Sequence, residues 1–493
     1  MRPIVAREIP RRALSLCAIA LLIASALGLE LKAEPFAVRG YYLTMMRMPV
    51  MGLPEWKEAL DCFAEDEANT VVLWTAGGFR SRKFPVTWRH NAEHENVRAD
   101  FVRELIDYAH TKGIRVLLGF TPFGYDGVNS FPLEHPELKA RKKDGSAVDE
   151  FGIHCRGWNM CPAQSESQRL MREYAAEMAF EFYPNADGLL VESSDYAICH
   201  CPECGPRFYE HEFAFVRWLS EEMWRHKPDA LVLVYPHYFT GAKVPGLDAT
   251  AARQPFDRRW GLFFTPHSAH FDDALIRQAK TSVFWSDAPV LGTPRRVIDA
   301  ARTARAHGVT GFLPSLEAFS YVMLGPDGGE PSLIGKRQRP FGLDPLGEGR
   351  MPYGNLVVRV QRFAVSEFSR EPALAPEEWE RRLGRHLFGE KASPQSIADV
   401  LELQRIWMHE SDWYWPSPLL DPEFFRLRAQ RLKWSREKLA AYAANLARLS
   451  EIAARYAGAE QPNEREMGRL AGMVGERWGS KSPIDATPAP SQK

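Results

Sequence analysis

Residues 71–74 read Val-Val-Leu-Trp and residues 231–234 read Leu-Val-Leu-Val, two apolar runs with no polar alternation. Continuous apolar strands of this kind are typical of a parallel sheet that is covered on both faces. Strand-length apolar segments recur along the chain, and together with these two they are Val38–Met46, Thr70–Thr75, Arg115–Thr121, Gly188–Glu192, Ala230–Tyr235, Gly261–Thr265, Thr281–Trp285 and Val309–Pro314.

Amphipathic segments of helical length lie between the predicted strands. They are Pro54–Ala68, Ala99–Lys112, Ser165–Tyr183, Phe208–His226, Asp272–Lys280 and Pro294–His307. Eight strands that alternate with helices predict an α/β fold, a (β/α)8 TIM barrel, over residues 34–348. If residues 261–265 form a loop instead of the sixth strand, the two strands that follow become the sixth and seventh strands of the barrel.

The pattern after Pro352 is helical and predicts an all-α helical domain over residues 349–460. The expected helices are Asn355–Phe368, Pro376–Phe388, Ile397–Asp412 and a long one over Pro422–Tyr456. The long helix has an apolar residue every seventh position, which indicates a packing seam: Phe425, Leu432, Leu439 and Leu446. This favours a bundle packed on the barrel over a free coiled-coil dimer. Residues 461–493 are rich in Pro, Ser, Gly and charge, and we predict a disordered tail there.

The N-terminus has the pattern of a secretory signal peptide over residues 1–33. Four arginines precede an apolar run over Ala13–Leu29, and small residues follow at the expected cleavage sites. We therefore expect export to the periplasm or beyond, with no membrane contact after cleavage. If the leader is not cleaved, the protein is membrane-anchored. A lipoprotein signal has a small residue directly before its cysteine, whereas Leu16 precedes Cys17 here, so we expect no lipid anchor on Cys17.

Charge and composition exclude several classes of protein. Lys plus Arg number 62 and Asp plus Glu number 63, so no basic field is available to hold a nucleic acid. A hydrophobic fraction of 45% excludes wholesale disorder. The glycine-rich loops or cations that hold a phosphate do not follow the predicted strands, and we expect no cofactor.

Polar and aromatic residues follow the predicted strands, at the end where a barrel of this type carries its active site. In strand order these residues are Trp74, Glu192, Asp195, Tyr235, His237, His267, Trp285, Asp287, Glu317 and Phe319. Carboxylates together with aromatic faces are what cleavage of a glycosidic bond requires. A structural ion pair or helix cap is the alternative role for each carboxylate.

We assign Glu192 as the general acid, with a pKa raised by apolar neighbours and a nearby carboxylate. Glu317 is the nucleophile or base, and Asp287 assists. The predicted substrate-binding residues fall into two groups. Trp74, Tyr235, Trp285 and Phe319 form an aromatic platform for the sugar, whereas Asp195, His237 and His267 are placed to bind sugar hydroxyls.

Six cysteines follow the leader, and three of them lie close together in the segment Cys199-His200-Cys201-Pro202-Glu203-Cys204. In an exported protein an even number of cysteines favours disulfides. The spacing is also that of a metal knuckle, but structural zinc requires four ligands. Cys155, Cys161 or a histidine would then have to complete the site. We predict no catalytic metal and keep structural zinc on Cys199, Cys201 and Cys204 as an alternative to disulfides, with free thiols as the third.

The segment from Asp187 through Asp195 into Cys204 resembles a stretch of bacterial glycoside-hydrolase-like barrels related to α-glucuronidases and β-hexosaminidases. In these barrels a fourth strand leads into a Cys-x-Cys-x-x-Cys loop. The segment Arg362–Phe368, continuing to Gly389, resembles the start of the helical domain that follows such barrels. The resemblance extends over roughly Phe36 to Asp412, and it implies a barrel that acts on carbohydrate.

Val191 departs from the patterns of two related groups. Hexosaminidases that use the substrate acetamido group carry Asp before the strand-four Glu, and the large retaining clan carries Asn there. The α-glucuronidases use an acid Glu with a late Asp and a late Glu, roles that Glu192, Asp287 and Glu317 match, with inversion implied. We therefore predict a secreted glycosidase that cleaves an O-glycosidic bond of an oligo- or polysaccharide. A catalytically inactive glycan-binding barrel and a metal-dependent hydrolase that uses the Cys/His segment are the alternatives.

Overall fold

The structure is a computed structural model, and it describes residues 34–43, 52–74, 79–88, 98–124, 127–151, 156–193, 198–241, 253–264, 272–285, 293–315, 354–407, 417–420 and 422–486. Eight parallel strands close into a barrel in the order β1-β10-β9-β8-β7-β6-β3-β2. They are β1 (Val38–Leu43), β2 (Thr70–Trp74), β3 (Arg115–Phe120), β6 (Gly188–Val191), β7 (Leu231–Val234), β8 (Trp260–Phe264), β9 (Ser282–Phe284) and β10 (Gly311–Phe312). The predicted (β/α)8 barrel is confirmed, and so is its sixth strand, β8.

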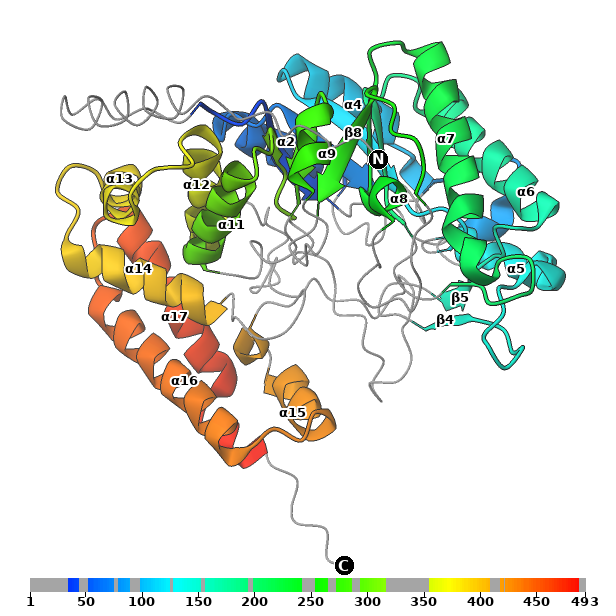
Figure 1. The fold of residues 1–493 in the computed structure, drawn as a ribbon. Helices are drawn as coiled ribbons and strands as arrows, with labels where there is room; N and C mark the ends of the chain where they lie inside the picture. The colour runs from blue at the N-terminus through cyan, green and yellow to red at the C-terminus, as the bar shows by residue number, and fades with distance from the viewer. Residues whose placement is uncertain are drawn as a thin grey trace, which may run out of the picture.

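Helices surround the barrel (Figure 1). The main ones are α2 (Leu53–Glu65), α4 (Val102–Thr111), α6 (Ser165–Ala176), α7 (Phe208–His226), α9 (Asp273–Gln278) and α11 (Pro294–Ala306). The last turns of α6 continue as a π-helix over Glu177–Phe182. Shorter elements are α5 (Phe131–Glu134), α8 (His237–Thr240), the hairpin β4 (Asp149–Phe151) and β5 (Arg156–Trp158), and 3-10 turns at Pro85–Thr87, Val128–Ser130, Pro136–Leu138 and Gly205–Arg207.

A glycine at the start of β6 allows the neighbouring strand to approach closely. Gly188 is in register with Leu231 of β7. A Cβ atom at Gly188 would lie 1.9 Å from the Leu231 carbonyl oxygen, so no larger residue fits without moving the strand. This close pairing sets the position of β6, the strand that ends immediately before Glu192.

The C-terminal region is helical, as predicted. Its helices are α12 (Leu356–Arg370), α13 (Pro376–Phe388), α14 (Pro394–Trp407), α15 (Pro422–Arg431), α16 (Arg436–Tyr456) and α17 (Pro462–Trp478), with 3-10 turns at Pro418–Leu420 and Pro483–Ala486. They lie on one side of the barrel, next to α11 (Figure 1). The predicted boundary between the two domains, at residues 348 and 349, lies outside the described residues.

The single helix predicted over Pro422–Tyr456 is wrong, because the chain breaks into α15 and α16. Lys433 has a φ of 49°, which ends the first helix, and the Ser435 side chain caps the second by accepting from the Lys438 N–H. Leu432 is consequently 48% exposed, whereas Leu439 is buried. Of the four residues at seven-residue spacing, Leu432 at the break is therefore the exposed one, whereas Phe425 of α15 is buried and contacts Tyr442 of α16.

The predicted disordered tail over residues 461–493 is also wrong for most of its length, because α17 packs against α16. Gln461 caps α17, with its side chain accepting from the Glu464 N–H, and Met467, Leu470 and Val474 form its buried face. Gly468 lies against Tyr456, where a Cβ would be 2.9 Å from the Tyr456 Cβ. Gly468, one of the glycines that led to the prediction of disorder, is thus a point of close contact between α17 and α16. Residues 487–493 lie outside the described residues.

A buried ion pair joins the helical domain to the barrel. Arg362 of α12 donates from Nε and Nη2 to the two carboxylate oxygens of Asp66, at 2.7 and 2.8 Å. Asp66 follows α2 and also accepts from the Tyr41 hydroxyl at 2.7 Å. The Arg362 side chain is only 5% exposed. The two domains are therefore fixed to each other by paired charges as well as by apolar packing.

No helix within the described ranges is long and apolar enough to cross a membrane. The predicted leader, residues 1–33, lies outside those ranges.

The Asp100→Asn variant is expected to be more stable than the wild type at neutral pH, by a Tm difference on the order of 1 °C. Burial raises the pKa of Asp100, partly offset by the Tyr183 hydroxyl and by Arg80 and Arg82. Because the pKa is raised in the folded state, the carboxyl group stabilises the fold most when it is neutral, below about pH 3.9. This stabilisation is lost as the pH rises through the folded-state pKa. Asn stays neutral at every pH, and it tolerates the Asp100 φ of 47°.

Thermal unfolding at pH 7.5 and at pH 4.5 measures this effect. The advantage of Asp100→Asn should shrink at the lower pH. An advantage that grows as the pH falls would contradict the assigned direction of the pKa shift.

Candidate active site at the barrel mouth

A buried carboxylate ends the fourth strand of the barrel. Glu192 follows β6 directly and is 2% exposed. The Tyr42 hydroxyl of β1 donates to Glu192 Oε1 at 2.7 Å. Three strand intervals separate β1 from β6 around the barrel, so this bond crosses the barrel interior. The structure thus places the predicted acid inside the barrel at its C-terminal end.

Aromatic rings carried by, or directly following, five of the eight strands (β2, β1, β9, β8 and β7) form a connected group that includes Tyr42. The Tyr42 ring lies 5.1 Å from Trp285 and 6.1 Å from Trp74 between centroids. Phe263 stacks on Trp285 at 5.6 Å and meets Tyr235 at 5.4 Å. These five residues are the aromatic wall. It brings together three of the predicted platform residues and adds Tyr42 and Phe263, which the sequence analysis missed.

The members of the aromatic wall differ in burial. Trp285 and Tyr235 are each 8% exposed, whereas Trp74 is fully buried. The prediction that Trp74 forms part of the sugar platform is therefore not supported, because its ring is used in packing against Tyr42. His237 begins α8 and is 2% exposed, with its ring 5.0 Å from Tyr209 and 4.2 Å from Tyr238.

A second buried carboxylate supports the chain next to Glu192. Glu212 of α7 is fully buried and accepts from the Ser193 hydroxyl at 2.6 Å and the Tyr238 hydroxyl at 2.5 Å. Burial, followed by the charge of Glu212, raises the pKa of Tyr238 well above its usual value. Tyr238 therefore remains a hydrogen-bond donor over the working pH range. Glu212 was missed, although its place among the apolar positions of Phe208–His226 is a readable signal.

Five of the predicted site residues lie outside the described residues: Asp195, His267, Asp287, Glu317 and Phe319. Their roles stay predictions. Ser315 pairs with Tyr42 as an isolated parallel bridge, and Glu317 follows Ser315 by two positions. The chain that leads to Glu317 therefore passes beside the tyrosine that binds Glu192.

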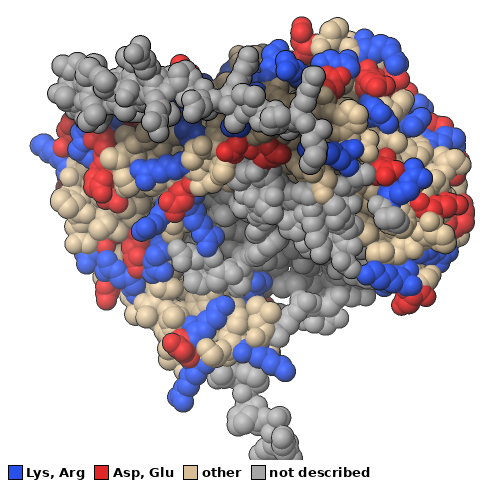
Figure 2. All heavy atoms as spheres, viewed as in Figure 1, with Lys and Arg blue, Asp and Glu red and all other residues tan. Residues whose placement is uncertain are grey.

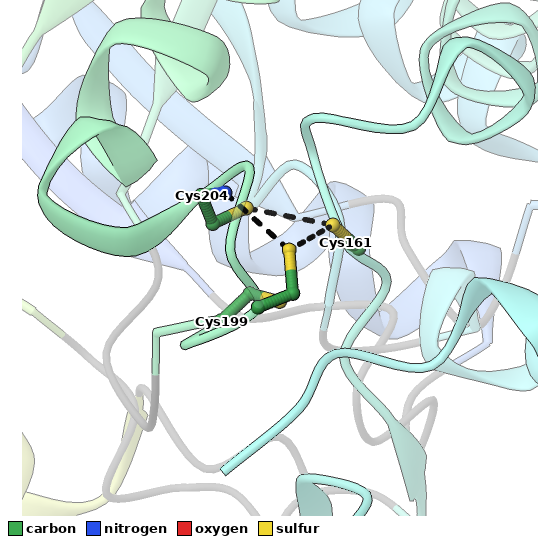
Figure 3. Close-up of side chains that lie close together, drawn as sticks. Cys161, Cys199 and Cys204 are labelled. Carbon is green, nitrogen blue, oxygen red and sulfur yellow. Dashed lines mark hydrogen bonds between the residues drawn. The ribbon is translucent and has the colours of Figure 1, made fainter. Parts of the chain in front are cut away.

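The four cysteines Cys161, Cys199, Cys201 and Cys204 lie together away from Cys62, and we call them the cysteine cluster. All four sulfur atoms lie within 4.8 Å of one another. Figure 3 shows Cys161 facing Cys199 and Cys204 from a separate segment of the chain. The five cysteines within the described residues form no disulfide with one another, which contradicts the disulfide interpretation for this segment. Of the proposed fourth members, Cys161 is the one that completes the group.

The described surface carries both signs of charge. Figure 2 shows Lys and Arg mixed with Asp and Glu over the face in view. This agrees with the formal net charge of −1.

No protein-family model matches the chain, and no curated protein matches it in sequence. The solved structures that resemble it include a GH138 enzyme targeting pectin rhamnogalacturonan II, with 12% identity and a TM-score of 0.48 over 90% of this chain. This chain spans 57% of the length of that enzyme. A β-N-acetylhexosaminidase matches with 13% identity and a TM-score of 0.47, over 82% of this chain and 88% of its own. An O-GlcNAc hydrolase of Thermobaculum terrenum matches with 11% identity and a TM-score of 0.43, over 89% and 81% of the two chains.

All three are glycoside hydrolases by description, and the likeness concerns the fold. The class of protein that the structure itself defines is a closed (β/α)8 barrel with a buried carboxylate at its mouth and a helical domain docked on one side.

Proposed function

We propose that the protein is a secreted glycoside hydrolase that cleaves an O-glycosidic bond of an oligo- or polysaccharide with two carboxylates. The observation that carries this proposal is the buried Glu192, which ends the fourth strand and is held by Tyr42 beside the aromatic wall. The leader sequence supports the assignment to an exported enzyme.

Glu192 acts as the general acid in this proposal. Its carboxyl group gives a proton to the glycosidic oxygen as the bond from that oxygen to the anomeric carbon breaks. Tyr42 fixes the orientation of the carboxyl group through their hydrogen bond. The Ser193–Glu212–Tyr238 network holds the adjacent backbone, so that the acid remains in place during turnover.

Glu317 supplies the second carboxylate and Asp287 assists it. As a nucleophile, Glu317 forms a bond to the anomeric carbon that water then hydrolyses; as a base, it takes a proton from the attacking water. Carboxyl groups about 5–5.5 Å apart produce retention, and a separation of about 6.5–9.5 Å produces inversion. The α-glucuronidase resemblance favours inversion.

The cysteine cluster argues against the metal-dependent alternative. Four protein sulfurs would fill the four positions around a tetrahedral ion and would leave none for a catalytic water. An inactive glycan-binding barrel is the remaining alternative, and the experiment below separates it from an enzyme.

The wild-type protein should cleave at least one member of a panel of aryl-glycosides and of plant, bacterial and host polysaccharides. Release of reducing ends measures cleavage, and a glycan array measures binding on the same preparation. Binding without any cleavage would favour the inactive barrel. Neither binding nor cleavage across a broad panel would contradict a carbohydrate function.

The Trp285→Phe variant should raise KM roughly three- to tenfold with a smaller change in kcat. Trp285 is 8% exposed, and its buried indole N–H has no acceptor among the described residues, so it is placed to donate to a sugar hydroxyl. One neutral hydrogen bond contributes about 0.5–1.5 kcal/mol. Phe keeps the stacking on Phe263. Trp379→Phe is the matched control, because Trp379 is also a buried tryptophan but belongs to α13 of the helical domain. A KM change in the control equal to that in Trp285→Phe would contradict the assignment of Trp285.

A further inference from the structure

Four sulfur atoms from two separate stretches of chain meet in one small volume. Cys161 precedes α6, and the other three cysteines lie between β6 and α7. The Cys161 sulfur lies 3.6 Å from that of Cys201 and 3.4 Å from that of Cys204. A tetrahedral zinc ion with Zn–S bonds of about 2.3 Å has sulfur–sulfur edges of about 3.8 Å. The observed separations, all within 4.8 Å, match such a shell.

The arrangement does not have the geometry of disulfides. In a disulfide, two sulfur atoms are bonded at about 2.05 Å, so each sulfur has one partner that is much closer than any other sulfur. Here Cys161 is near Cys201 and Cys204 at almost equal distances. One central ion accounts for a sulfur that has two sulfur neighbours at such distances within a group of four that spans at most 4.8 Å.

The backbone around the cysteine cluster is arranged to stabilise thiolates. The Arg141 N–H donates to the Cys199 sulfur at 3.3 Å, and the Cys204 N–H donates to the Cys201 sulfur at 3.3 Å. The Gly205 N–H returns to the Cys201 carbonyl at 2.8 Å, in a turn where Gly205 has a φ of 33°. This tight turn directs Cys201 and Cys204 toward the same point.

We propose that the cysteine cluster binds one structural Zn²⁺ ion through Cys161, Cys199, Cys201 and Cys204. The four thiols lose four protons on binding, and Zn²⁺ with four thiolates carries a net charge of −2, with no change of oxidation state. Cys161, Cys199 and Cys204 are each at most 1% exposed, which suits a closed site without a bound water.

The zinc ion joins the segment between β5 and α6 to the segment after β6, the strand that leads to Glu192. The segment after β6 also contacts Arg141, which precedes β4, because the His200 N–H donates to the Arg141 carbonyl at 2.6 Å. Cys199 follows Glu192 by seven residues. The ion therefore sets the path of the chain at one side of the barrel mouth without taking part in the chemistry there.

Metal analysis of the purified full-length protein tests the proposal. About one zinc per chain is expected. Cys161→Ser and Cys204→Ser should each lose most of the metal, whereas Cys62→Ser should keep it, because Cys62 is a half-buried thiol outside the cluster. Cobalt substituted for zinc should show the intense visible absorption of a tetrahedral thiolate site.

Counting the reactive thiols of the wild type tests zinc binding by the cysteine cluster even if the serine variants fail to fold. A chelator under native conditions should release the zinc, expose four further reactive thiols and lower the Tm. An unreduced intact mass lower by four hydrogens than that of the all-thiol chain, with no metal, would show two disulfides and overturn the proposal. Bound iron in place of zinc would overturn the assignment of the ion. Each readout is independent of glycosidase activity.

Discussion

The Glu192→Gln variant should lose at least about a hundredfold in kcat/KM on any substrate that the wild type cleaves, since general acid catalysis contributes about 10²–10⁴-fold. Gln cannot donate a proton to the leaving oxygen, but its amide oxygen can still accept from the Tyr42 hydroxyl. We therefore expect the fold to survive. Steady-state kinetics with the best substrate of the panel, together with thermal unfolding, measure the two effects separately.

Glu210→Gln is the control for this substitution. Glu210 lies in the first turn of α7 and pairs at the surface with Arg207. Its loss should leave kcat/KM unchanged within about twofold, because exposed ion pairs contribute little. A Glu192→Gln variant with full activity would remove Glu192 from the mechanism. Circular dichroism spectra of Glu192→Gln and the wild type show whether a loss of activity is due to unfolding rather than to the missing acid.

The Arg362→Met variant should lower the free energy of unfolding by about 3–5 kcal/mol, the usual cost of removing one partner of a buried pair. The substitution leaves the Asp66 carboxylate, whose side chain is only 12% exposed, without its guanidinium, next to the Tyr41 hydroxyl. Because Arg362 joins α12 to the barrel, the helical domain should loosen first. Denaturant unfolding, followed by tryptophan fluorescence, measures the change.

Asp66→Asn combined with Arg362→Met should recover part of this loss, because the double variant buries no unpaired charge. Arg381→Met is the exposed control, since Arg381 is 60% exposed in its pair with Glu378 and should cost at most about 1 kcal/mol. An Arg362→Met variant no less stable than Arg381→Met would contradict the account of the domain interface.

The barrel could be predicted from the sequence because its strands are continuous apolar runs, such as Leu231–Val234. Local composition was a poorer guide in the helical domain. The break at Lys433 depends on one left-handed residue, and α17 is held by packing against α16 that no local pattern encodes. A Gly- and Pro-containing segment can be ordered when it has a partner helix to bury its apolar face.

The candidate site could be predicted in part. Glu192 was found because a carboxylate directly after an apolar strand points to the barrel mouth. Its partner Tyr42 lies 150 residues away in sequence, and Cys161 lies 43 residues from Cys204. Such pairs depend on how the strands are ordered around the barrel, which sequence spacing alone does not specify.

The most direct test of the central claim is a crystal structure of the Glu192→Gln variant with an uncleaved oligosaccharide from the panel. We expect the scissile glycosidic oxygen within about 2.6–3.2 Å of the side chain at position 192. We also expect a sugar ring in contact with Trp285 or Tyr235. An oligosaccharide bound elsewhere on the molecule, with position 192 out of reach of any glycosidic oxygen, would contradict the role of Glu192 as the general acid.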